Sequence, residues 1–221
     1  MELEVRNENL DICRECGGAC CIKCGCDYAV GDFNEKSYNA FLEALSVGDK
    51  SIVAVMNFRE LNNGKFIAEP ILYIRARNEN RDIVDLVSMK TRCSMLSDTG
   101  CKYDYEHRPF GGKNLKPVRA SEGKCRPVVS PLLMIEEWIP YQKQLSKIVK
   151  RYTGKSVDDK IREDVENLFY RWLIKDFNGV MALEYKDLQG FIPLLKRAYH
   201  SEYERVMQRV NGKSFARVLR K

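Results

Sequence analysis

The sequence lacks the features of a membrane-spanning or exported chain. No apolar run in its 221 residues approaches the roughly 18 uninterrupted apolar positions of a transmembrane helix. Residues 1–30 contain no basic start followed by an apolar segment, so no secretory signal peptide is predicted. We therefore expect a cytoplasmic protein with no membrane partner.

Several familiar catalytic motifs are also missing. The chain has no Gly-x-Ser-x-Gly elbow, no Gly-x4-Gly-Lys-Ser/Thr phosphate loop and no Gly-x-Gly-x-x-Gly dinucleotide motif. Histidine is scarce, with 2 residues in all, which disfavours a catalytic zinc site that relies on histidine ligands. His107 precedes Arg108-Pro109, and we interpret it as a hydrogen-bonding residue rather than a metal ligand.

Cysteine, in contrast, is abundant and concentrated in one place. Six of the 9 cysteines lie within residues 13–26, where Gly17, Gly18 and Gly25 are interspersed among them. Thiols separated by two or three residues can converge on one cation, and glycine lets the backbone wrap closely around it. In a reducing cytoplasm these spacings, together with the odd cysteine count, favour metal ligation over disulfides.

The three remaining cysteines are Cys93, Cys101 and Cys125. Thiolate sites for Zn²⁺ or iron–sulfur clusters usually recruit a distant ligand pair, so we expect these residues to complete the site. The Ser-Asp-Thr-Gly run at residues 97–100 predicts a tight turn that brings Cys93 and Cys101 towards each other.

The formal net charge of +6 is distributed unevenly. Residues 129–221 hold 18 Lys and Arg against 12 Asp and Glu, whereas residues 1–128 hold 19 of each sign. Two tetrathiolate Zn²⁺ sites would add about −4 to the first part and polarise the molecule. Charges of both signs alternate along the predicted C-terminal helices, as is typical of solvated helix faces. The sequence therefore disfavours nucleic-acid binding and leaves a protein or peptide partner as an open alternative.

Hydrophobic periodicity predicts an α+β fold: a small antiparallel sheet, a Cys-rich metal-binding region and a C-terminal helical segment. We divide the chain into a cysteine-cluster domain, residues 1–130, and a helical segment, residues 131–221, packed on it. The sheet is predicted as a three-stranded meander with strands at residues 52–58, 66–76 and 83–88 and a hairpin turn at residues 62–64.

Capping residues and apolar stripes predict the helices. The first is expected to begin at a cap on Asn34 and to end at Gly48. A second helix is predicted at residues 132–152, with a break at Pro140. A third is predicted to begin at a cap on Ser156 and to end at residues 178–179. A fourth is predicted at residues 192–210 as one helix that ends at Asn211-Gly212.

The cysteine pattern resembles a known family. Cys-x-x-Cys-Gly-Gly-x-Cys-Cys-x4-Cys, followed by Arg108-Pro109, is similar to the YkgJ-type cysteine-cluster family, a zinc- or iron-chelating domain, across roughly residues 11–126. Three residues rather than two precede the double cysteine here, and Cys24 is a ninth thiol outside the pattern. The resemblance implies eight metal-ligating cysteines: Cys13, Cys16, Cys20, Cys21, Cys26, Cys93, Cys101 and Cys125.

Relatives of that family include the flagellin lysine methylase. The resemblance therefore also implies an alternative function, a metal-dependent enzyme that modifies proteins or peptides, such as a lysine N-methyltransferase. The eight thiols suit two four-sulfur sites or one site with bridging cysteines, and the metal is either Zn²⁺ or iron in an iron–sulfur cluster. Adjacent Cys20 and Cys21 point apart in an extended chain, which favours two sites.

Three arginines are candidates for binding an anionic cofactor, substrate or the negative cluster itself. Arg75 and Arg77 are two apart on a predicted strand and therefore share one face, and Arg108 belongs to the Arg-Pro pair. The alternative is that Arg75 and Arg77 are simply exposed and that Arg108 pairs with Asp104 or Glu106.

Overall fold

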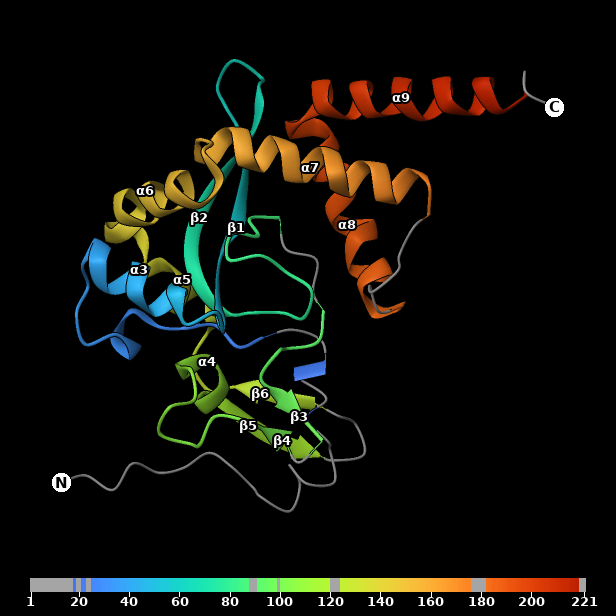
Figure 1. Cartoon of the computed structure of the whole chain (residues 1–221). Coiled ribbons are helices and arrows are strands. Elements are labelled where there is room, and N and C mark those ends of the chain that lie inside the picture. The colour runs from blue at the N-terminus through green and yellow to red at the C-terminus, as the bar shows by residue number, and fades with distance from the viewer. Residues whose placement is uncertain are drawn as a thin grey trace.

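The structure is a computed structural model that describes residues 18, 21–22, 25–87, 91–98, 100–119, 124–175 and 182–218. Within these ranges the fold is α+β, as predicted, with three two-stranded antiparallel sheets and a helical C-terminal segment (Figure 1). The long hairpin β1–β2 crosses the middle of the molecule. The short hairpins β3–β4 and β5–β6 lie at the end far from α9.

The main sheet consists of β1 (Lys50–Glu60) and β2 (Phe66–Ala76). Their antiparallel register runs from Lys50 opposite Ala76 to Glu60 opposite Phe66, and Gly64 takes a φ of 76° in the connecting turn. Both strands and the turn at residues 62–64 are confirmed. Glycine is required there because side chains with a Cβ rarely adopt positive φ.

The predicted third strand at residues 83–88 is wrong over its described part, residues 83–87. Val84 forms an isolated parallel bridge to Ile52. The Ile52 N–H donates to the Ile83 carbonyl at 2.7 Å, and the Ile52 carbonyl accepts from the Asp85 N–H at 2.9 Å. The chain then turns so that Leu86 becomes fully buried and its N–H donates to Asp164 Oδ2 at 3.2 Å. Burying one side chain against α7 therefore removes this segment from the sheet edge.

The first predicted helix is α3 (Tyr38–Ser46), and it ends at Gly48 as expected, with φ at 93°. Its cap is Ser37, not Asn34, because Ser37 Oγ accepts from Ala40 N–H at 3.2 Å. A short 3-10 turn, η1 (Val30–Asp32), precedes it and buries Phe33, so the chain becomes helical later than the polar residues suggested.

The next helices follow the predicted breaks and caps. Helix α5 (Pro131–Glu136), the turn η3 (Ile139–Tyr141) and helix α6 (Gln142–Thr153) confirm the interruption at Pro140. Ser156 caps α7 (Val157–Leu173) through its Oγ, which accepts from Asp159 N–H at 3.1 Å. The apolar stripe predicted for this helix is buried at Ile161, Val165, Leu168 and Phe169 and only partly buried at Val157, Trp172 and Leu173.

The single helix predicted at residues 192–210 is wrong. The chain forms α8 (Ala182–Ala198) and α9 (His200–Val218), which meet at buried Tyr199. The bend lets α9 lie along α7, where the Phe169 and Tyr203 rings meet edge to face at 5.3 Å (Figure 1). Helix α9 also continues through exposed Asn211-Gly212, so the predicted helix end at this pair is wrong. Helix α7 ends at Leu173, with Ile174 as its C-cap and Lys175 at a φ of 55°, so its predicted end at residues 178–179 is wrong; residues 178–179 themselves lie outside the described ranges.

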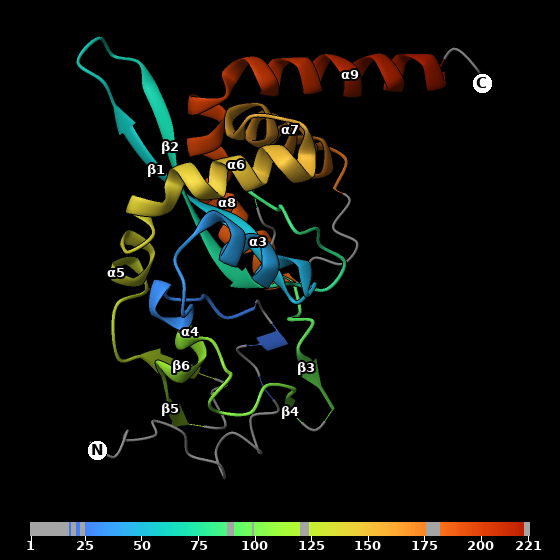
Figure 2. The same cartoon turned by 60° about the vertical axis from the view of Figure 1, so that its left-hand side comes forward.

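Helices cover both faces of the β1–β2 hairpin. Figure 2 shows α3 and α6 in front of it and α8 behind it, in agreement with the contacts of α6 and α8 with β2. Buried residues from before and after residue 130 belong to one hydrophobic cluster. The boundary between residues 130 and 131 stays a prediction. None of the described helices is long and apolar enough to cross a membrane.

A buried carboxylate joins α9 to α7. Glu202 has a side chain that is only 2% exposed and accepts hydrogen bonds from Arg162 Nη1, from Ser201 Oγ at 2.8 Å and from Arg205 Nη2 at 3.3 Å. Burial raises the pKa of Glu202, but the hydrogen bonds from Ser201 and Arg162 outweigh it, so its pKa is lowered overall. Its charge therefore stabilises the folded state.

This pKa direction predicts how stability depends on pH. The contribution is fully present above the unfolded-state pKa of about 4.3 and is lost as pH falls through the lower folded-state pKa. We expect Glu202→Gln to cost about 1–2 kcal/mol of unfolding free energy at pH 7 and much less at pH 3, as measured by urea titration at both pH values. Exposed Glu204 on the same helix supplies the control, Glu204→Gln. An equal loss at both pH values would contradict the prediction.

Candidate metal centre

The cysteine segment near the N-terminus is attached to the end of β2. Ala76 N–H donates to the Cys26 carbonyl at 2.8 Å, and Tyr28 N–H donates to the Ile74 carbonyl at 2.9 Å. Residues 26–28 therefore extend the β1–β2 sheet as a short antiparallel neighbour of β2, with Asp27 bridging Arg75. This pairing fixes half-buried Cys26 against the rigid sheet.

The segment that carries Cys93 lies between the residues after β2 and the N-terminal segment. Asn78 and Cys93 form an antiparallel bridge, and Ser94 N–H donates to the Arg77 carbonyl at 2.9 Å. On its other side, Cys93 N–H donates to the Cys21 carbonyl at 2.7 Å. Backbone hydrogen bonds thus gather the segments bearing Cys21, Cys26 and buried Cys93 around the residues that follow β2.

Asn78 connects two of these segments through its side chain. It is buried, and its Oδ1 accepts the Gly25 N–H at 2.6 Å, while its backbone bridges Cys93. Because a buried N–H without a partner costs free energy, this contact holds the Gly25 backbone in place. Asn78 was not a predicted site residue, because nothing in the local sequence distinguishes it from a turn asparagine.

Cys101 lies in the hairpin of β3 (Leu96–Ser97) and β4 (Gly100–Cys101), opposite Leu96. Ser97 is paired with Gly100, whose φ is 113°, so the chain reverses between them as the predicted turn requires, although Thr99 lies outside the described residues. A Cβ on Gly18 would lie 2.8 Å from Leu96 Cδ1, which shows that the hairpin touches the N-terminal cysteine segment.

Cys125 is opposite Pro117 in the hairpin of β5 (Leu115–Arg119) and β6 (Lys124–Pro127). Buried Asn114 joins this hairpin to α4 (Phe110–Lys113), because its side chain exchanges two hydrogen bonds with the Val129 backbone at 2.7 and 2.8 Å. Helix α4 in turn contacts the Cys26 segment, where Gly111 N–H donates to the Asp27 carbonyl at 2.9 Å. The hairpin bearing Cys125 is therefore linked to the first cysteine segment.

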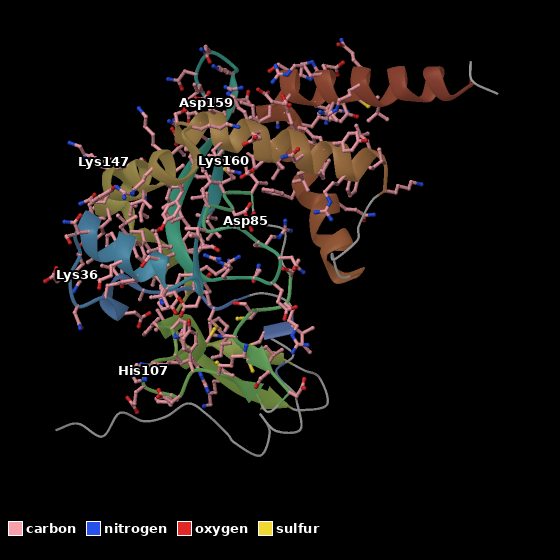
Figure 3. The ribbon with its side chains drawn as sticks, viewed as in Figure 1. Lys36, Asp85, His107, Lys147, Asp159 and Lys160 are labelled. Carbon is pink, nitrogen blue, oxygen red and sulfur yellow. The ribbon has the colours of Figure 1, made fainter. Side chains whose placement is uncertain are left out.

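The cysteine-bearing hairpins lie at one end of the molecule, where sulfur atoms are visible below the main hairpin (Figure 3). Among the described cysteines, Cys26 and Cys101 are not in disulfide bonds. No three Cys, His, Asp or Glu side chains of the described residues are grouped to hold a metal ion. Four cysteines lie outside the described residues: Cys13, Cys16, Cys20 and Cys24.

The candidate arginines Arg75 and Arg77 make internal contacts. Arg75 has a side chain that is 12% exposed, pairs with Asp27 at 2.7 Å and donates to the Tyr73 hydroxyl at 2.7 Å. Arg77 donates to the Lys50 carbonyl from Nε at 3.3 Å and from Nη2 at 3.1 Å. Arg75 is therefore not simply exposed to solvent, because its side chain is paired with Asp27, the residue next to Cys26.

Arg108 lies beside Cys26. A Cβ built on Gly112 would be 2.9 Å from Arg108 Cδ and 3.2 Å from Cys26 Sγ, so both side chains pack over the same glycine. Glycine at position 112 permits this close approach. His107, exposed and labelled in Figure 3, pairs with Asp104 at 2.7 Å, in keeping with a hydrogen-bonding role.

A polar network that the sequence did not predict lies next to these segments. The Tyr28 hydroxyl donates to the Tyr103 hydroxyl at 3.0 Å, and the Tyr103 hydroxyl donates to the Asp49 carboxylate. Asp49 also accepts from Lys50 Nζ at 2.8 Å. The tyrosines are 75 positions apart, so no local pattern could have indicated the contact.

The likeness to the YkgJ-type family rests on the cysteine pattern and stays a prediction. Comparisons of the chain with protein-family models, with curated proteins and with solved structures found no match.

Proposed function

We propose that this protein binds Zn²⁺ or an iron–sulfur cluster through thiolates from its N-terminal and central cysteines. The observation that carries the proposal is the set of backbone hydrogen bonds that join the segments of Cys21, Cys26 and Cys93. One of them connects the Cys93 N–H to the Cys21 carbonyl oxygen at 2.7 Å. Residues 13–26 hold four further cysteines besides Cys21 and Cys26, and these can supply additional sulfur donors. Soft thiolate donors of this kind suit Zn²⁺ and iron–sulfur clusters.

Further ligands for such sites are available in the N-terminal segment. Cys13, Cys16, Cys20 and Cys24 lie outside the described residues, and the first three belong to the eight cysteines of the family pattern. Cys24 is a ninth candidate ligand.

Positive charge beside the cysteines supports the proposal. A Zn²⁺ ion with four thiolates carries a net charge of about −2, which a nearby cation stabilises when water is partly excluded. The aliphatic part of Arg108 packs over Gly112 next to Cys26 Sγ, and Arg75 is held one residue away through Asp27. We propose that the Arg108 guanidinium balances the charge of the metal–thiolate site rather than binding a separate substrate.

Metal analysis of anaerobically purified protein tests the proposal. A brown protein that absorbs near about 400 nm would identify an iron–sulfur cluster, and a colourless protein with stoichiometric zinc would identify Zn²⁺. We expect the double variant Cys26→Ser/Cys93→Ser to lose most of the bound metal measured by mass spectrometry. Ser94→Ala, which alters the residue after Cys93 without removing a thiol, should retain it. Metal-free wild-type protein with reduced thiols would overturn the proposal.

A further inference from the structure

We infer that Tyr103 is a positioning residue whose hydroxyl fixes the Cys101 loop against the Cys26 segment. Its consequence for metal affinity rests on the proposed function. Tyr103 follows Cys101 by two residues, and Tyr28 follows Cys26 by two residues. The hydrogen bond of 3.0 Å between their hydroxyls therefore joins two cysteine-bearing segments directly.

The partners of Tyr103 belong to the rigid part of the fold. Tyr28 is buried, its ring lies 5.6 Å from that of Phe33, and its backbone is paired with β2. Asp49 immediately precedes β1, and its carbonyl accepts the Arg77 N–H at 2.7 Å. The Tyr103 backbone, in contrast, lies in the irregular stretch between β4 and α4. The two hydroxyl contacts therefore attach a loop to an already fixed scaffold.

The direction of the two hydrogen bonds is set by the protonation states. A tyrosine hydroxyl has an ordinary pKa of about 10, so it carries its proton at neutral pH and can donate one hydrogen bond. Asp49 is held by Lys50 Nζ at 2.8 Å and accepts the hydrogen bond from the Tyr103 hydroxyl. Tyr28 donates to Tyr103, which donates to Asp49, because a carboxylate accepts hydrogen bonds and Tyr103 has a single proton to donate.

Removing the Tyr103 hydroxyl should release the loop without dismantling the core. Tyr103→Phe keeps the ring, but it leaves the Tyr28 hydroxyl without its acceptor and removes one donor from Asp49. A hydrogen bond to a charged group is among the stronger ones, so its loss shifts local opening by about tenfold or more. Misplaced supporting groups around a metal site typically lower metal affinity by about 10–100-fold.

Two measurements on the full chain test the inference. Amide hydrogen exchange should accelerate about tenfold or more across residues 100–105 in Tyr103→Phe, while exchange in β1 and β2 stays unchanged. Zinc affinity, measured by competition with a chromogenic chelator, should fall about 10–100-fold. Tyr152→Phe, at an exposed tyrosine on α6, is the matched control and should leave both readouts at the wild-type level.

The outcomes separate this inference from the proposed function. Unchanged exchange in residues 100–105 would overturn the positioning role, whatever the metal content. Faster exchange with wild-type zinc affinity would overturn the link between the loop and the metal. If the wild-type chain bound neither zinc nor iron, the proposed function would fail, and the exchange comparison would still decide whether Tyr103 positions the loop.

Discussion

Replacing Gly25 with alanine should lower the free energy of unfolding by about 3 kcal/mol or more. A Cβ at this position would lie 1.9 Å from the Ala76 carbonyl oxygen and 2.7 Å from its carbonyl carbon. Those atoms are backbone atoms of β2, which cannot rotate away as a flexible side chain could. Relief of the clash requires the Cys26 segment to separate from the sheet.

That separation would break two contacts that hold the cysteine region. Ala76 N–H would lose the Cys26 carbonyl at 2.8 Å, and Gly25 N–H would lose Asn78 Oδ1 at 2.6 Å. We therefore expect Gly25→Ala to reduce metal content together with stability. Both effects can be followed in the same preparation, by urea-induced unfolding and by metal analysis.

Gly31→Ala is the appropriate control for this substitution. No heavy atom of the described residues lies within 4 Å of a Cβ built on Gly31, and its φ is not positive. Its free energy of unfolding should stay within about 0.5 kcal/mol of the wild-type value. A Gly25→Ala protein as stable as Gly31→Ala would show that the Cys26 segment does not pack on β2 in this way.

Replacing Trp138 with alanine should cost about 3–5 kcal/mol of unfolding free energy. Trp138 is fully buried, and its ring lies 5.4 Å from Phe41 and 5.6 Å from Phe33. The substitution removes these aromatic contacts and leaves a cavity where η1, α3 and α5 meet. It also removes the Nε1–H donor that bonds the Tyr28 carbonyl at 2.9 Å.

One further variant separates the loss of the indole donor from the loss of the ring, and a second serves as a control. Trp138→Phe keeps a ring but not the indole donor, so we expect a smaller loss of about 1–2 kcal/mol from the unsatisfied Tyr28 carbonyl and imperfect packing. Half-buried Trp172 provides the control, and Trp172→Ala should cost clearly less than Trp138→Ala. Urea titrations of all three proteins measure these differences. Equal losses for the two alanine variants would contradict the assigned role of Trp138.

Prediction from sequence succeeded where the decisive interactions were local. The break at Pro140, the cap at Ser156 and the turn at Gly64 each depend on dihedral angles or hydrogen bonds within a few residues. These features follow from short-range chemistry and therefore leave a pattern in the sequence.

Prediction failed where a distant contact outweighed local preference. Residues 83–88 were expected to pair as a strand, but burial of Leu86 against α7 turned the chain away. The helix expected at residues 192–210 bends at Tyr199 so that α9 can pack along α7. In both cases the apolar pattern was correct, and the surface that would bury it was not encoded locally.

By itself, the sequence determined the α+β class, the β1–β2 hairpin, the approximate positions of α3 and of α5 to α7, and the concentration of thiols near the N-terminus. It did not predict the short strands β3 to β6 or helix α4. Only the tertiary structure decided that Arg75 pairs with Asp27, that Asn78 holds Gly25 and that Tyr103 joins Tyr28 to Asp49. The two residues of each of these pairs lie 48 to 75 positions apart in the sequence. Such contacts form because folding brings the segments together, and neither residue of a pair carries a local mark of the other.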